Sequence, residues 1–401
     1  MQKQYKTIIV GGGAAGLLAG VELLKGSNAF LGEEVLILER CDRVGKKLIA
    51  TGNGQGNLMN EKFGEEFYYG DKGFIQTFVS KAKELGLKKY LAELGIFLSA
   101  SKDGKFYPLS KQASSVLDSI RGFLVHKNCT VLTGKRVTKV IKMGSGFEIH
   151  AGLEKFYAKT VIMATGGSAG KQFGTDGSAY GLALGLGHKL TDLYPSLVQL
   201  KTPTHQVKGL KGIKETARVT AFVGGKPIMS AEGDLLFTDF GVSGSTIFTL
   251  SASIADKKGA YLIAEFLPKL SFSQTEKIIE KRMNLSYLEK EDLLCGIINK
   301  KIGQKILKNA KTFTMTDIAY AVKNFKLTVI GSLDFSYAQT TRGGIKTDKI
   351  DPETYMSKLA NGFYIVGEAL DVDGDCGGYN LTFAFTSGII AGRNIKESFN
   401  G

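Results

Sequence analysis

The chain contains no tryptophan, and only 6 prolines, 4 cysteines and 4 histidines occur among its 401 residues. The cysteines stand far apart, at Cys41, Cys129, Cys295 and Cys376. They form no CxxC pair, so the sequence indicates neither a disulfide framework nor a zinc site. The histidines are equally scattered, which argues against a metal cluster or a Ser-His-Asp triad. We therefore expect no metal in this protein.

Long apolar runs are also missing. No stretch of about 18 apolar residues occurs, as a membrane-spanning helix would need. The first residues, MQKQYKTIIVGGG, lack the apolar region and the small-residue cleavage site of a signal peptide. These absences predict a cytoplasmic protein without a membrane partner.

Charge of one sign is in excess, with a formal net charge of +14. The stretch from Lys269 to Ile330 holds 12 Lys and Arg against 6 Asp and Glu. No recognisable nucleic-acid-binding module accompanies it, so a solvated basic face is the simpler interpretation. We do not expect a nucleic-acid partner, but the net positive charge leaves one open, because charge concerns association rather than fold.

At 401 residues, the chain exceeds what one compact core usually holds. Its patterns predict a nucleotide-binding domain over residues 1–193 and 334–401, split by an insert over residues 194–333. Short alternating strands broken by Gly-Gly and Glu-Gly turns indicate a barrel or sandwich over about 194–270. Residues 271–330 read as short helices, one of them with a capping box at Ser273 and Glu276.

The N-terminal stretch KTIIVGGGAAGLLAGVELLKG predicts a buried strand over residues 7–10, a glycine turn, and a helix over residues 14–24. Gly11, Gly13 and Gly16 have GxGxxG spacing, which suits a tight turn, close approach of a pyrophosphate, and helix packing. The next strand, EEVLILER, ends on Glu39, 23 residues beyond Gly16. Its carboxylate is placed to bind ribose hydroxyls, so we expect a dinucleotide here.

Further glycine-rich segments favour FAD over a nicotinamide. Lys46 and Lys47 can neutralise phosphate, and the glycines of ATGNGQGN let backbone approach a flat ring. A later strand ends in VIMATGG, residues 161–167. Near the C-terminus, DVDGDCGGYN either forms a plain turn or places a helix N-terminus near the flavin pyrimidine, where it would stabilise the anionic reduced form.

Over its whole length the sequence resembles the bacterial NAD(P)/FAD-dependent oxidoreductases of the YhiN or BaiN group, which include proteins described as aminoacetone oxidases. The segments IIVGGGAAG, GKKLIATGNGQGN, TTRGGI and GEALDVDGDCGGYNLTFAFTSGIIAG carry this resemblance. It implies an α/β, Rossmann-like FAD-binding domain split by an insert of a small β-barrel and a helical subdomain. Many members have Arg-Cys at Gln55-Gly56 and Pro at Ser245.

Motif and resemblance together predict one FAD site with no obvious general acid. Tyr107 and Tyr379 are candidate proton donors beside the flavin, and packing is the alternative role for both. The predicted cofactor-binding set is Gly11, Gly13, Ala14, Ala15, Gly16, Glu39, Arg40, Lys46, Lys47, Thr51, Gly52, Asn57, Val137, Thr165, Gly166, Gly367, Glu368, Asp371, Gly378, Tyr379, Asn380 and Leu381.

We therefore predict an FAD-dependent oxidoreductase that moves hydride from NAD(P)H to a small organic substrate lying between the flavin and the insert. No second strand, GxGxxG and helix unit follows Glu39, so NAD(P)H would visit the flavin transiently. Two alternatives remain open at this point. One is a flavin-dependent RNA-modifying enzyme, and the other is a non-enzymatic flavin sensor.

Overall fold

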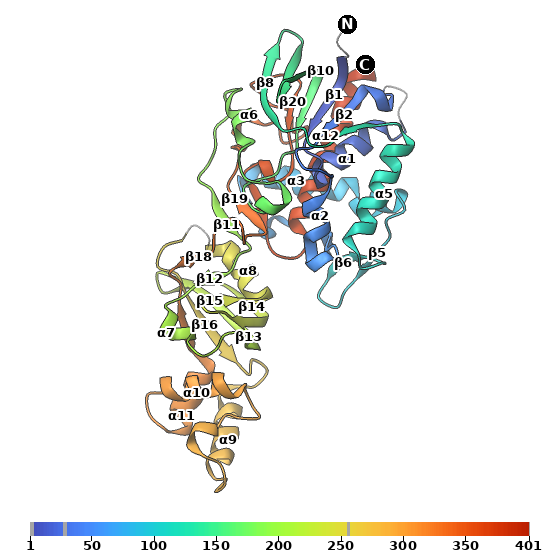
Figure 1. The fold of residues 1–401 in the computed structure, drawn as a ribbon. Helices are drawn as coiled ribbons and strands as arrows, with labels where there is room; N and C mark the ends of the chain where they lie inside the picture. The colour runs from blue at the N-terminus through green and yellow to red at the C-terminus, as the bar shows by residue number, and fades with distance from the viewer. Residues whose placement is uncertain (1–3, 27–29, 255–256, 401) are drawn as a thin grey trace. The chain divides into compact units, whose positions relative to one another are not determined.

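The protein is described here by a computed structural model that covers residues 4–26, 30–254 and 257–400. The chain divides into two compact units (Figure 1). Unit 1 comprises Met1–Tyr194 and Gln339–Gly401, and unit 2 comprises Pro195–Ala338. The predicted insert, residues 194–333, covers most of unit 2. No helix in the described part of the chain combines the length and apolarity needed to cross a membrane.

A seven-stranded sheet forms the centre of unit 1. Strands β7, β2, β1, β10 and β20 run parallel, and β9 and β8 continue the sheet antiparallel. Every residue of β2 is buried, as expected for a parallel strand covered on both faces. The strands are β1 (Gln4–Val10), β2 (Val35–Leu38), β7 (Thr130–Leu132), β8 (Val137–Met143), β9 (Gly146–Ala151), β10 (Glu154–Met163) and β20 (Phe363–Ile365).

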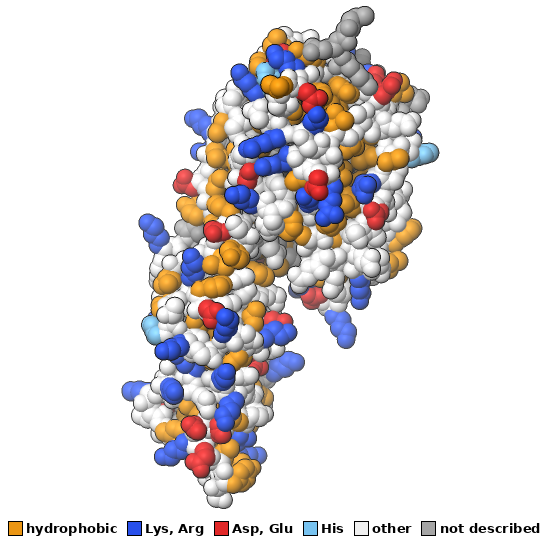
Figure 2. Space-filling model, in the orientation of Figure 1, with side chains coloured by type: hydrophobic (Ala, Val, Ile, Leu, Met, Phe, Trp, Pro, Cys, Tyr) orange, Lys and Arg blue, Asp and Glu red, His pale blue; other side chains and the backbone are white. Residues whose placement is uncertain are grey.

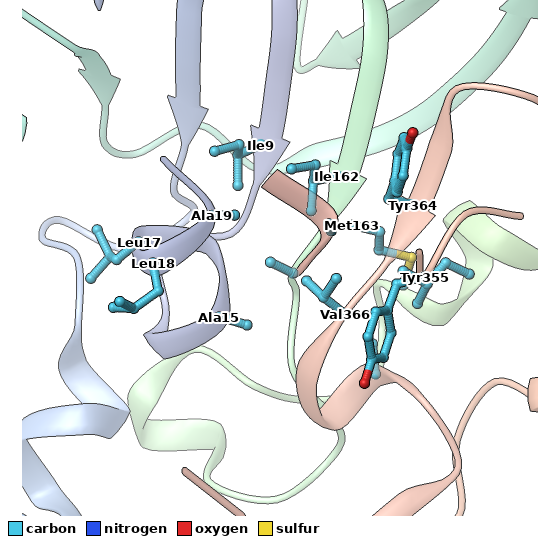
Figure 3. Close-up of a cluster of buried hydrophobic side chains, with 14 of the residues drawn as sticks. Ile9, Ala15, Leu17, Leu18, Ala19, Ile162, Met163, Tyr355, Tyr364 and Val366 are labelled. Carbon is cyan, nitrogen blue, oxygen red and sulfur yellow. The ribbon is translucent and has the colours of Figure 1, made fainter. Parts of the chain in front are cut away.

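Two helices from opposite ends of the chain, α1 (Ala14–Leu24) and α12 (Tyr379–Asn400), pack against each other. A Cβ added at Gly388 would lie 2.2 Å from the Ala15 carbonyl oxygen, so only glycine permits this approach. Figure 3 shows Ala15 and Ala19 of α1 in the same apolar cluster as Ile9 of β1 and Ile162 of β10. The C-terminal helix thereby completes the core around the first glycine turn.

Smaller elements of unit 1 surround this centre. Strands β3, β6 and β5 form an antiparallel sheet, and β4 pairs with β21. These elements are α2 (Lys46–Ala50), β3 (Met59–Asn60), β4 (Tyr68–Gly70), α3 (Lys72–Leu85), α4 (Leu87–Glu93), β5 (Leu98–Ala100), β6 (Lys105–Pro108), α5 (Ala113–His126), α6 (Tyr180–Leu184), β19 (Thr340–Arg342) and β21 (Val372–Gly374).

Unit 2 has its own core around an antiparallel sheet with the order β17-β16-β13-β14-β15-β12-β18. Helix α8 packs on β14 and β13, and α9 to α11 lie between β16 and β17 in the sequence. The elements are β11 (Tyr194–Ser196) at the division, β12 (Leu200–Lys201), α7 (Thr204–Val207), β13 (Lys214–Val223), β14 (Lys226–Phe237), β15 (Gly241–Ser243), α8 (Ser245–Ile254), β16 (Tyr261–Phe266), α9 (Phe272–Met283), α10 (Lys300–Asn309), α11 (Met315–Lys323), β17 (Phe325–Thr328) and β18 (Gly331–Ser332).

The capping box predicted at Ser273 and Glu276 is wrong. Helix α9 is capped two residues earlier, where the Ser271 hydroxyl accepts from the Gln274 N–H at 3.2 Å. The Gln274 side chain in turn accepts from the Ser271 N–H at 2.8 Å. Both serines fit the sequence pattern, because each has Glu or Gln three residues later, and the earlier one starts the helix.

Candidate functional site

The first glycine turn connects β1 to α1 and leaves little room for side chains. Gly11 has a φ of +108°, and a Cβ there would lie 2.3 Å from the Ala164 carbonyl oxygen. A Cβ at Gly16 would lie 2.0 Å from the Gly11 carbonyl oxygen. In contrast, a Cβ at Gly13 would meet nothing within 4 Å. The N-terminus of α1 therefore faces open space, as an anion-binding turn requires.

Glu39 lies at the end of β2, beside this turn. Its Oε2 accepts from the Gly12 N–H at 2.8 Å, and its Oε1 accepts from the Cys41 N–H at 2.7 Å. The side chain is 9% exposed. Each carboxylate oxygen has a second lone pair, so the group can still accept a ribose hydroxyl while the backbone holds it in place.

The segment that follows β10 contributes Thr165 and Gly166 to the same region. A Cβ at Gly11 would lie 3.2 Å from Thr165 Cα. The Thr165 hydroxyl is buried and has no hydrogen-bond partner among the residues that the structure describes. A buried hydroxyl of this kind calls for a ligand or water partner. Together with the glycine turn, it fits a bound dinucleotide.

Lys47 and Glu368, both predicted site residues, are brought together. Lys47 Nζ lies 2.5 Å from Glu368 Oε2 and donates to the Ala169 carbonyl at 3.0 Å. Glu368 Oε1 accepts from the Thr341 N–H at 3.0 Å. The Thr341 hydroxyl in turn accepts from the backbone N–H groups of Ser168 and Ala169, at 2.8 and 2.9 Å. Thr341 was not among the predicted site residues, although the TTRGGI segment contains it.

The other predicted cations have partners of their own. Arg40 makes two hydrogen bonds to the Asp176 carboxylate, at 2.7 and 2.9 Å. This guanidinium holds the pKa of Asp176 well below its usual range. Lys46 forms an ion pair at 2.5 Å with Asp42, whose side chain is 75% exposed. In this structure, none of the three cations at positions 40, 46 and 47 lacks a carboxylate partner.

The remaining residues of the predicted dinucleotide half lie close to these groups. Ala14 and Ala15 open α1, and a Cβ at Gly367 would lie 3.0 Å from Ala15 Cβ. Val137 begins β8, two residues after Lys135, whose N–H donates to the Glu39 carbonyl at 2.8 Å. The structure thus gathers this part of the set around the carboxyl ends of the parallel strands.

The predicted flavin half contains a turn over Thr51–Gly54 with two consecutive left-handed residues, Gly52 at φ +57° and Asn53 at φ +53°. A Cβ at Gly52 would lie 3.6 Å from Tyr107 Cε1. Tyr107 is half-buried, and burial raises its pKa. The structure therefore places Tyr107 against the turn that was predicted to approach the ring.

The segment before α12 packs closely against β3. A Cβ at Gly378 would lie 2.6 Å from Met59 backbone atoms. Oriented to satisfy both neighbours, the Asn57 amide bridges the Gly378 N–H, at 3.2 Å, and the Met59 carbonyl, at 3.1 Å. The Asn380 amide pairs with both the N–H and the carbonyl of Gly374, at 2.9 and 2.7 Å. This glycine cluster is therefore both a tight turn and an anchored helix N-terminus.

Tyr379 lies at the start of α12 but its ring packs inside unit 1. The side chain is 4% exposed and stacks on Phe67 with 4.7 Å between ring centroids. Burial raises the Tyr379 pKa. This environment favours packing over proton donation. Leu381 also packs against the core, and the Asp371 N–H donates to the Ile345 carbonyl at 2.9 Å.

A cluster of polar groups that the sequence did not predict lies on β4, β19 and β21 and between β21 and α12. The Tyr69 hydroxyl donates to Asp375 Oδ1 at 2.9 Å. Arg342 forms an ion pair with Asp373, with 3.1 Å between Nε and Oδ1, and its guanidinium lies 3.8 Å from the Tyr69 ring centroid. The alternating acids of DVDGD were a signal for the carboxylates. No sequence signal indicated Tyr69.

Comparison with known proteins identifies the family. The HI0933-like protein Rossmann domain matches residues 5–394. The chain belongs to this family. It is 35% identical to a 3-dehydro-bile acid delta(4,6)-reductase of Clostridium scindens, over 97% of this chain and 98% of the relative. It is 23% identical to a ribosomal RNA dihydrouridine synthase of Haemophilus influenzae, over 99% and 100% of the two chains.

Solved structures agree on the fold. A 3-ketosteroid delta1-dehydrogenase from Sterolibacterium denitrificans matches with a TM-score of 0.52 at 13% identity, over 98% of this chain and 100% of the other. A flavocytochrome c3 fumarate reductase matches with a TM-score of 0.50 at 16% identity, over 100% and 79%. The predicted family and the Rossmann-like fold class are confirmed. The protein is an FAD-dependent oxidoreductase.

Proposed function

We propose that this flavoenzyme reduces a carbon–carbon double bond conjugated to a carbonyl group in a small organic substrate, with NAD(P)H as the electron donor. The observation that carries the proposal is the 35% identity, across nearly the whole of both chains, to a 3-dehydro-bile acid delta(4,6)-reductase. The name of that relative describes a ring ketone with neighbouring double bonds. Such an alkene accepts hydride because the carbonyl takes up the developing negative charge.

The residues around the glycine turn suit FAD in this role. The N-terminus of α1 would hold the pyrophosphate and Glu39 the ribose, while the Thr51–Gly54 turn and the start of α12 would lie near the ring. When bound and reduced, FAD supplies the hydride. The protein supplies orientation, exclusion of water and the proton. The sequence has no second dinucleotide unit, so NAD(P)H would use the same cavity as the substrate.

An anaerobic half-reaction experiment tests this function. The FAD-loaded protein is reduced with NADH or NADPH and then mixed with a 3-oxo-4,6-diene bile acid. We expect the flavin absorbance to return at a rate that saturates with this acceptor, and to stay bleached with the corresponding saturated 3-oxo bile acid. A flavin that neither nucleotide reduces, or that the diene does not reoxidise faster than buffer, contradicts the proposal.

A second candidate is reduction of uridine in RNA. Relatives from Haemophilus influenzae and Escherichia coli, 23% and 22% identical over nearly the whole chain, are ribosomal RNA dihydrouridine synthases. Uracil also contains a double bond conjugated to a carbonyl. The helical part of unit 2 presents basic side chains that could meet phosphates (Figure 2). The exposed lysines there are Lys277, Lys281, Lys290, Lys300, Lys301, Lys308 and Lys311.

Analysis of ribosomal RNA separates the two candidates. Deleting the gene should leave the dihydrouridine content unchanged if the substrate is a small molecule, and should remove one dihydrouridine if it is RNA. Purified protein that retains RNA at physiological salt would also favour the second candidate. The third hypothesis, a flavin sensor, finds no support in these relatives, which are all named as enzymes.

A further inference from the structure

We propose that Tyr69 and Asp375 form the proton-supplying pair of this enzyme, in which the tyrosine hydroxyl protonates the substrate and the carboxyl group behind it replaces the proton. The inference rests on the proposed function, because a reduced double bond needs one proton in addition to the hydride. The sequence offered Tyr107 and Tyr379 as candidate proton donors and did not indicate Tyr69.

Tyr69 lies on β4, and Asp375 directly follows β21, the strand that pairs with β4. In the antiparallel pair β4 and β21, Asp373 stands opposite Tyr69, and Asp375 follows two residues later. The Tyr69 hydroxyl donates to Asp375 Oδ1 at 2.9 Å. Asp375 is only 5% exposed, whereas Tyr69 is partly exposed. The pair therefore joins a buried acid to a partly exposed tyrosine.

This pair is continuous with the segments that would surround the flavin. The Asp375 N–H donates to the Phe67 carbonyl at 2.9 Å, and the Asn380 amide of α12 donates to the Asp375 carbonyl at 3.4 Å. Arg342, above the Tyr69 ring, directly follows Thr341, whose N–H donates to Glu368. The Tyr69 ring thus contacts the residue next to Thr341, and Asp375 lies four residues before the first residue of α12.

Burial leaves Asp375 able to exchange a proton near neutral pH. Burial raises the pKa of Asp375 to about 6, although the hydrogen bond from Tyr69 and the charge of Arg342 act in the opposite direction. The other titratable groups near it are Asp373 on β21, Tyr68 on β4, Tyr379 on α12 and the neighbouring thiol of Cys376.

Tyr69 itself stays protonated over the same range. Burial and the Asp375 carboxylate both raise its pKa. An acid of this kind does not release its proton to water, but it can protonate a strongly basic carbon that forms when hydride reaches the neighbouring position. The pair therefore combines a donor of high pKa with a carboxyl group that solvent can reprotonate near neutral pH.

The double bond receives two electrons and one hydrogen as hydride from the reduced flavin. The Tyr69 O–H bond breaks, and a C–H bond forms at the alkene carbon that the hydride does not reach. The Asp375 carboxyl group passes its proton to the tyrosinate oxygen, and water restores the carboxyl group. The alkene is reduced, the flavin is oxidised, and the net proton comes from solvent.

The first test does not depend on turnover. Infrared titration of the FAD-loaded protein should show a protonated carboxyl band that disappears as the pH rises through about 6. Asp375→Asn should remove the band, and Tyr69→Phe should shift its midpoint to higher pH, because it removes a hydrogen bond to the carboxylate. Tyr90→Phe is the matched control, since Tyr90 donates to the buried Glu22 at 2.8 Å elsewhere in unit 1. A Tyr69→Phe midpoint equal to that of the wild type overturns the pair.

The second test asks whether the pair lies near the flavin. Above pH 6, Asp375→Asn removes a negative charge and should raise the flavin midpoint potential, whereas below pH 5 it should change little. Tyr90→Phe should change neither value. An unchanged potential at both pH values overturns the proposal. This readout stands even if the bile acid fails as a substrate, so failure of the proposed function and failure of the pair are distinguishable.

The third test separates protonation from electron transfer. Reoxidation of the reduced flavin by the 3-oxo-4,6-diene should slow about 100-fold or more in Tyr69→Phe, the range for loss of a general acid. Reoxidation by ferricyanide, which needs no proton on carbon, should keep the wild-type rate. Equal slowing with both acceptors would show that Tyr69 only supports the fold.

Discussion

Lys47 and Glu368, 321 positions apart in the chain, meet with 2.5 Å between Nζ and Oε2. Lys47 belongs to α2, which follows the first β-α-β unit, and Glu368 follows β20 near the C-terminus. The ion pair therefore joins the two halves of unit 1 at the carboxyl ends of its parallel strands.

Breaking this ion pair should destabilise unit 1. Lys47→Met leaves Glu368, whose side chain is 17% exposed, without its cation, and should lower the free energy of unfolding by about 1–3 kcal/mol. Lys46→Met is the control, because its partner Asp42 is largely exposed and such pairs contribute about 0–1 kcal/mol. Urea unfolding followed by circular dichroism measures both. Equal decreases in the free energy of unfolding of the two variants would contradict a stabilising role for the Lys47–Glu368 ion pair.

Loss of the Glu39 carboxylate should weaken FAD binding. Glu39→Ala leaves the Gly12 and Cys41 N–H groups without their acceptor and removes the predicted ribose contact, at a cost of about 1–3 kcal/mol. Titration of apoprotein with FAD, followed by flavin fluorescence, gives the dissociation constant. The exposed Glu33 provides the control Glu33→Ala. An unchanged constant in Glu39→Ala removes this residue from the site.

Two glycine-to-alanine variants should have opposite effects. In Gly388→Ala the new methyl would lie 2.2 Å from the Ala15 carbonyl oxygen, and such overpacking costs about 1–3 kcal/mol. In Gly122→Ala, within α5, the methyl would meet nothing within 4 Å, and the gain in helix propensity should stabilise by up to about 1 kcal/mol. Thermal unfolding compares them. A Gly388→Ala variant with wild-type thermal stability would mean that α1 and α12 can separate without a loss of stability.

The buried carboxyl of Asp375 should make stability depend on pH. The pKa of Asp375 is about 6 in the folded protein and therefore exceeds its value in the unfolded chain. The protonated carboxyl group contributes fully to the free energy of unfolding below about pH 4, and this contribution is lost as the pH rises through 6. Asp375→Asn should therefore gain stability relative to wild type between pH 4 and 7, on the order of 3 kcal/mol. Urea unfolding at both pH values measures this gain. The exposed Asp118 gives the control Asp118→Asn, and equal pH dependence in both variants would refute the shift.

A shared cavity for NAD(P)H and substrate predicts ping-pong kinetics. Initial rates at varied concentrations of both should give parallel double-reciprocal lines, because NAD(P)+ leaves before the acceptor enters. Product inhibition by NAD(P)+ should then be competitive with the acceptor. Intersecting lines, together with a ternary complex in rapid mixing, would instead require a separate nicotinamide site.

The sequence by itself determined the features that depend on neighbours along the chain. The helix predicted over residues 14–24 is α1, with the same bounds. The GxGxxG pattern predicted the geometry of the first turn. The positive φ of Gly11 and the close approach at Gly16 arise because a strand, a turn and a helix follow one another directly in the sequence. Glu39 could be located for the same reason, since it ends the next strand along.

Only the tertiary structure decided which side chains meet and which lose water. The sequence left Tyr379 as either a proton donor or a packing residue, and its ring stacks on Phe67 in the folded protein. Tyr69 carried no signal until β4 paired with β21 and placed it against Asp375. Hydrogen bonds and desolvation depend on contacts between segments hundreds of residues apart, which no local pattern contains. The proposed acid Tyr69 can therefore be recognised only from the folded protein, in which β4 and β21 are paired.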